Sequence, residues 1–150
     1  MEQDVLPLPK TYLILMIIMT FITLGAYIGF WFLKRKKHFQ SINQQHYIPF
    51  RWWVVATIYL VISLLLALVG ELIFTPYGLV HIESLEFILV YFFLALLYFS
   101  IFRVKELLEE FEGLEINKYL LFIFHIFYLQ YKINRYLSEV NQERFHEQTA

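Results

Sequence analysis

The sequence contains no cysteine, which excludes disulfide bonds, thiolate catalysis and metal or cluster sites with cysteine ligands. Charge is also scarce. Asp, Glu, Lys and Arg make up 17% of the 150 residues, whereas about one quarter is usual in a soluble domain. Hydrophobic residues reach 59%, and the polar segments between the apolar runs are too short for a separate soluble domain. We therefore expect a single membrane domain over residues 1–150.

The longest uncharged run extends from Thr11 to Leu33. As one helix it would reach about 35 Å, enough to cross a hydrocarbon core about 30 Å thick. Cations beside a span are retained in the cytoplasm, so we expect the N-terminus outside and the loop 34–51 inside. The run is followed at once by four cations, which would either set this topology or bind anionic lipid headgroups: Lys34, Arg35, Lys36 and Lys37.

Two further spans are expected over residues 52–74 and within 85–112. The first begins with two tryptophans, which favour the headgroup boundary, and ends before a Thr-Pro turn signal. The connection up to Glu86 carries carboxylates and no Lys or Arg, so we expect it to be an outer loop. Beyond about residue 102 the second of these helices becomes amphipathic, with glutamates on its solvated face.

A last helix is expected over residues 117–140, but its apolar run from Tyr119 to Tyr131 is short for a bilayer. A full span and a half-inserted or re-entrant helix both remain open. The expected fold is therefore all-α: a polytopic membrane helical bundle with three transmembrane helices and a short fourth hydrophobic helix.

Two motifs carry a resemblance to a known family. Thr23-Leu24-Gly25-Ala26-Tyr27 followed by Trp31 is similar to the T-L-G-x-Y-x-x-x-W signature of small bacterial membrane proteins that share a domain of unknown function. The segment from Tyr128 to Asn134 resembles the Y-L-Q-x-x-x-N ending of some members. The resemblance implies a multi-pass protein of the bacterial cytoplasmic (inner) membrane. It implies no reaction, substrate or catalytic residue.

Small residues at helical spacing form two pairs, Gly25 with Gly29 and Ser63 with Ala67. Such pairs let two helix backbones approach closely in a membrane. The contact would be either internal packing of the bundle or a seam between copies of the chain.

Three ionisable residues are candidates for a polar site in or near the membrane: Glu71, Glu86 and His125. Ionisable residues inside a membrane are functional suspects by default. The plainer interpretation gives the two glutamates an interfacial position. It gives His125 a hydrogen bond across helices, for example to Ser63, Thr20 or a tyrosine hydroxyl.

No nucleophile, metalloprotease, phosphate-loop or dinucleotide motif occurs in the sequence, so no enzyme, cofactor or metal site is expected. The cations belong to no nucleic-acid-binding module. The expected partners are the lipid bilayer and either further copies of the chain or a larger membrane complex. We expect a non-catalytic accessory or self-associating membrane component, and the alternative is a subunit of a small oligomeric transporter or channel.

Overall fold

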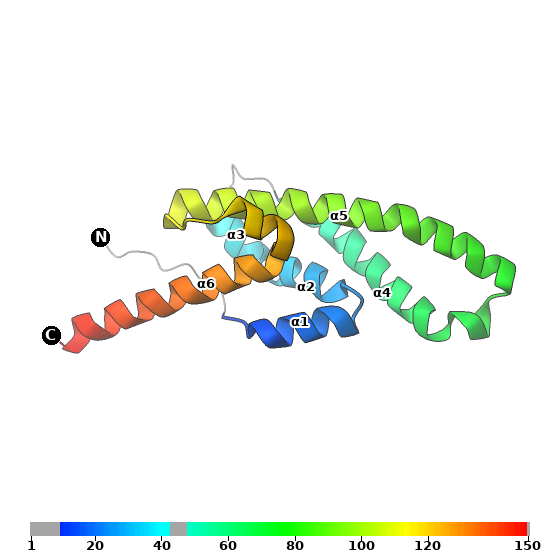
Figure 1. The fold of residues 1–150 in the computed structure, drawn as a ribbon, viewed down its shortest axis with the longest axis horizontal. Coiled ribbons are helices and arrows are strands. Elements are labelled where there is room, and N and C mark those ends of the chain that lie inside the picture. Colours follow the sequence, from blue (N-terminus) through cyan, green and yellow to red (C-terminus); the bar gives the residue numbers. More distant parts are fainter. Residues whose placement is uncertain (1–9, 43–47, 150) are drawn as a thin grey trace.

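The computed structural model describes residues 10–42 and 48–149, and every regular element in that part of the chain is a helix. The all-α expectation is confirmed. The helices are arranged lengthwise, and α5, α6 and α4 are, in that order, the three longest (Figure 1). In chain order they are α1 (Leu13–Ile22), α2 (Ala26–Lys34), α3 (Lys36–Ile42), α4 (Phe50–Ile73), α5 (Pro76–Glu112) and α6 (Lys118–Thr149).

The expected single helix over 11–33 is wrong, because this run folds into a helical hairpin. α1 ends at Ile22, and α2 begins at Ala26 and runs back alongside it (Figure 1). At the open end of the hairpin, Arg35 Nη2 donates a hydrogen bond to Thr11 Oγ1 over 2.7 Å. The two ends of the apolar run therefore lie side by side, and not about 35 Å apart as one helix would place them.

Backbone N–H groups of the hairpin turn form hydrogen bonds within the hairpin itself. Leu24 and Gly25 take positive φ angles of 47° and 91°, a conformation that costs a non-glycine residue about 1–2 kcal/mol. Gly25 N donates to Thr20 O over 2.8 Å, and Tyr27 N donates to Thr23 Oγ1 over 3.0 Å. Irregular backbone is tolerated at membrane depth only when its polar groups are bonded within the protein. In this turn, the N–H groups of Gly25 and Tyr27 are both bonded within the protein.

The outer loop expected up to Glu86 is also wrong, because α5 already begins at Pro76. Thr75 is the N-cap residue, and its side chain accepts a hydrogen bond from Gly78 N over 3.4 Å. Proline suits the first position of a helix, where its missing N–H costs nothing. Glu86 consequently lies inside a helix, ten residues after Pro76, the first residue of α5.

The apolar run in α6 doubles back as well. His125 has φ 47° and ψ −128°, which are not helical values, and the chain bends sharply there (Figure 1). The re-entrant alternative for this segment matches that bend, since the residues before and after His125 run in different directions.

Aromatic packing joins the first hairpin to α4 and α5. Phe32 stacks on Trp53 with ring centroids 4.1 Å apart, and both side chains are buried. Trp53 Nε1 in turn donates to Ser100 Oγ on α5 over 2.9 Å. These contacts hold α2 against the beginning of α4, at the end of the molecule where α3 and the end of α5 also lie.

Two helices of the described chain are long and apolar enough to cross a membrane, through the segments Phe50–Gly70 and Ser84–Glu110. In each, only 22% of the apolar stretch is buried inside the protein. The apolar helix α1 is too short for a span. The structure therefore supports two spans where three were expected, since the run that would form the other one is a hairpin.

Candidate functional site

A buried group of polar side chains lies at the open end of the α1–α2 hairpin. Trp31, Arg35 and Gln130 are 1%, 2% and 0% exposed. Gln130 Oε1 accepts a hydrogen bond from Trp31 Nε1 over 2.8 Å and another from Arg35 Nη2 over 2.9 Å. One amide oxygen on α6 thus bonds two side chains that belong to α2 and its C-cap.

The same cluster reaches the start of α1. Gln130 Nε2 donates to Asn134 Oδ1 over 2.8 Å, and Asn134 Nδ2 donates to the carbonyl oxygen of Thr11 over 2.7 Å. Thr11 also accepts from Arg35. We call the five residues Thr11, Trp31, Arg35, Gln130 and Asn134 the polar latch, because they tie together the start of α1, the end of α2 and the middle of α6.

Arg35 carries the charge of the polar latch. Burial lowers its pKa from 12.5 to about 10, an effect that Tyr27 partly opposes, so the guanidinium remains charged at neutral pH. Its Cζ lies 4.2 Å from the centroid of the Trp31 ring, within the range of a cation–π interaction. This geometry holds Arg35 as a fixed cation inside the protein.

The four consecutive cations therefore divide into two kinds. Lys34, Lys36 and Lys37 are exposed, whereas Arg35 is buried in the polar latch. The expectation that Arg35 binds lipid headgroups is wrong, because its side chain points into the protein. The three lysines remain available to solvent or headgroups at this end of the molecule.

The small-residue pairs lie in different surroundings. Gly25 is in the hairpin turn and not on a helix face shared with Gly29, and a Cβ built on it would lie 4.0 Å from Phe93 Cζ. A Cβ on Gly29 would lie 2.1 Å from Thr57 Oγ1. Gly29 thus lets α2 approach α4 within the chain, and it is buried there. Ala67 is exposed on α4.

A Gly29→Ala substitution should destabilise the fold by about 1–3 kcal/mol, because the added methyl group forces Thr57 to move. Thermal unfolding in a mild detergent measures the effect. Gly78→Ala is the matched control, since its Cβ would meet its neighbours at ordinary contact distances of 3.5 Å or more. Combining Gly29→Ala with Thr57→Ala should restore part of the loss. Equal melting temperatures for the two glycine variants would contradict the packing argument.

The candidate polar residues do not converge on one site. Glu86 is half-buried, and its Oε1 accepts a 2.6 Å hydrogen bond from Ser63 Oγ in the middle of α4. His125 Nε2 is hydrogen-bonded to the hydroxyl group of Tyr98 at the bend of α6. Glu71 lies in the last turn of α4, and its side chain is outside the part that the structure describes.

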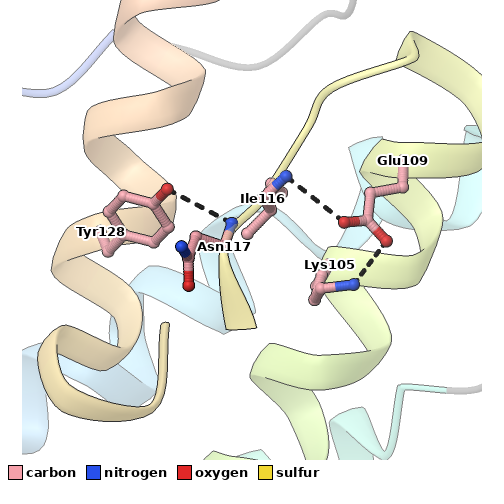
Figure 2. Close-up of polar contacts among 5 residues, drawn as sticks. All are labelled: Lys105, Glu109, Ile116, Asn117 and Tyr128. Atoms are coloured by element: carbon pink, nitrogen blue, oxygen red, sulfur yellow. Dashed lines mark hydrogen bonds and ion pairs between the residues drawn. The ribbon is translucent and has the colours of Figure 1, made fainter. Parts of the chain in front are cut away.

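Figure 2 shows a polar junction between α5 and α6 that the sequence had not indicated. Glu109 pairs with Lys105 on its own helix and also accepts a 3.3 Å hydrogen bond from Ile116 N in the connection. Asn117 N donates to the hydroxyl oxygen of Tyr128 over 3.4 Å. Glu109 was expected only on a solvated face, yet it holds the connection that leads into α6. Spacing along α5 gave no signal for this, because the partner is a backbone group of another segment.

Sequence reasoning also missed Thr11 and Gln130 as partners of Arg35, and Asn134 as the residue that bonds to both of them. The usable signal was the pair of motifs, since Trp31 belongs to the first and Gln130 and Asn134 belong to the second.

Among the described residues, no group of three or more His, Asp or Glu side chains is arranged to hold a metal ion. Comparisons with protein-family models, curated proteins and solved structures gave no match to this chain.

Proposed function

We propose that this chain is a non-catalytic accessory component of the bacterial cytoplasmic membrane, in which α4 and α5 cross the bilayer and the α1–α2 hairpin enters and returns on one side. One observation carries the proposal. Polar side chains along the apolar helices bond to one another, as in the pairs Trp31–Gln130, Trp53–Ser100 and Ser63–Glu86. In hydrocarbon, polar groups must form hydrogen bonds with one another. Along a water-filled path, water would hydrate them instead.

The position of the exposed lysines supports an orientation of the protein in the membrane. Lys34, Lys36 and Lys37 lie at the open end of the hairpin, and the positive-inside rule assigns that end to the cytoplasm. Lys10 Nζ donates to Ser138 Oγ over 3.1 Å, so the start of the described chain and α6 are at this same end. In place of the expected outer position for the start of the chain, we therefore assign a cytoplasmic position to Lys10, the first described residue.

The surface for a partner is the cytoplasmic part of α6. Thr57 of the same chain fills the space beside Gly29, so Gly29 is not available for contact with another copy. Beyond Leu137, by contrast, α6 extends away from the other helices (Figure 1). On either side of Leu137, the surface of α6 carries an exposed Arg135–Glu139 ion pair of 2.8 Å.

Chemical crosslinking in native membranes, followed by purification in mild detergent, tests the proposal. We expect a crosslinked partner or a second copy with the full chain, and loss of that product when the chain ends at Ser138. Recovery of monomer alone from both forms would contradict an accessory role.

The Ser63–Glu86 pair favours the second candidate, a transporter or channel subunit, because a carboxylate inside an expected span often marks an ion path. We expect reconstituted protein to show no proton or cation flux above empty liposomes, and Glu86→Gln protein to behave identically. Flux in the unmodified chain that disappears in folded Glu86→Gln, with Ser84→Ala retaining it, would select the transporter instead.

A further inference from the structure

The α1–α2 hairpin is only long enough for one leaflet. Its arms have 10 and 9 residues and rise about 15 and 14 Å, which is half of a hydrocarbon core about 30 Å thick. The turn reaches the level of Phe93, which also contacts the ring of Trp53 near the beginning of α4. The bend of α6 lies at a similar or shallower level, beside Tyr98.

Beyond that level, the described chain contributes only α4 and α5. Their joined end projects past the turn of the hairpin and past the bend of α6 (Figure 1). The Ser63–Glu86 bond belongs to this region, about two helical turns beyond Phe93. The apolar side chains there are exposed, which fits a surrounding of lipid: Leu65, Leu68, Leu72, Ile73, Leu85, Phe87, Ile88 and Tyr91.

The two leaflets would therefore hold unequal amounts of protein. A helix about 10 Å across occupies roughly 80 Å² of leaflet area. The cytoplasmic leaflet would contain α1, α2 and the bend of α6 in addition to α4 and α5, whereas the outer leaflet would contain two helices. The protein thus displaces at least about twice as much lipid area from the cytoplasmic leaflet as from the outer one.

We propose that this protein is a curvature-sensitive wedge that favours bilayers whose leaflet at the Lys34–Lys37 end is convex. The inference rests on the proposed membrane insertion. Its physical basis is that unequal leaflet areas relax when the wider leaflet lies on the outside of a bend, as for other one-sided insertions. The expected ligand is a lipid surface of defined shape and not a particular headgroup.

Orientation in vesicles of different size tests the wedge. Because the chain has no cysteine, Gln40→Cys supplies one exposed thiol at the Lys34–Lys37 end of the molecule. Tyr77→Cys supplies one at the opposite end, where α4 and α5 are joined. Each full-length variant is reconstituted into small and large vesicles of the same neutral lipid. Labelling with an impermeant maleimide before and after lysis then gives the fraction of each thiol that faces outward.

For Gln40→Cys we expect an outward-to-inward ratio of about three in small vesicles and about one in large vesicles. Tyr77→Cys should give the reciprocal ratios. Ratios that do not depend on vesicle size would overturn the wedge while leaving membrane insertion intact. Failure of the protein to float with vesicles of either size would instead overturn the proposed function on which the wedge rests.

Discussion

Single cysteines at Tyr12 and Gln40 are expected to react with an impermeant maleimide from the same side of the membrane. Tyr12 is 84% exposed just before α1, and Gln40 is exposed on α3. The Arg35–Thr11 bond holds the two arms of the hairpin together at that end. The expected effect is all-or-none, because a label that cannot cross lipid reaches either both thiols or neither.

Tyr77→Cys is the control, since Tyr77 lies in the first turn of α5, at the end of the molecule where α4 and α5 are joined, and its thiol should react only from the opposite side. Reaction of the Tyr12 thiol together with the Tyr77 thiol would mean that residues 11–33 cross the membrane as one helix. A double substitution, Leu24→Ile with Gly25→Val, should favour that straight form, because β-branched residues resist the positive φ angles of the turn.

Gln130→Leu is expected to be among the most destabilising substitutions at a buried polar site, with a loss of about 2–4 kcal/mol. The change removes the acceptor of Trp31 Nε1 and an acceptor of Arg35 Nη2, while both donors stay buried. The measurement is unfolding in a mixed-micelle titration followed by tryptophan fluorescence, to which Trp31 itself contributes.

Gln142→Leu provides the matched control, because this side chain is exposed on α6 and its loss should cost less than about 0.5 kcal/mol. Gln130→Glu retains the oxygen that accepts from Trp31 and Arg35 at nearly the same volume but loses the Nε2 donor to Asn134, so its loss of stability should lie between those of Gln130→Leu and the control. If Gln130→Leu matched the control, the polar latch would contribute nothing to the fold.

The sequence predicted the later helices well, and for a clear reason. The segments 52–74, 85–112 and 117–140 correspond to α4, α5 and α6, because their apolar runs are bounded by proline, glycine or charge. The start of α5 was missed although Thr75 and Pro76 are ordinary N-cap and first-turn residues. The acidic residues that follow favour a loop by composition, but the N-cap at Thr75 begins the helix before them.

The hairpin and the polar latch could not be predicted in the same way. An isolated Gly25 inside an apolar run is compatible with a straight helix, and the choice of a turn depends on docking of Gly29 against Thr57 and of Phe32 on Trp53. Arg35 cannot be distinguished from its lysine neighbours by composition. Only its position at the C-cap of α2, facing Gln130 from a distant segment, places it in the interior.

The length of α5 has a mechanical consequence. Its 37 residues form one uninterrupted helix of about 55 Å, far longer than a hydrocarbon core of about 30 Å, and Glu109 near its C-terminal end is bonded to the connection that leads into α6. A tilt of roughly ten degrees about Pro76 would carry Glu109 sideways by about 9 Å. A change of tilt at the Pro76 end of α5 would therefore be carried along the helix to the connection with α6.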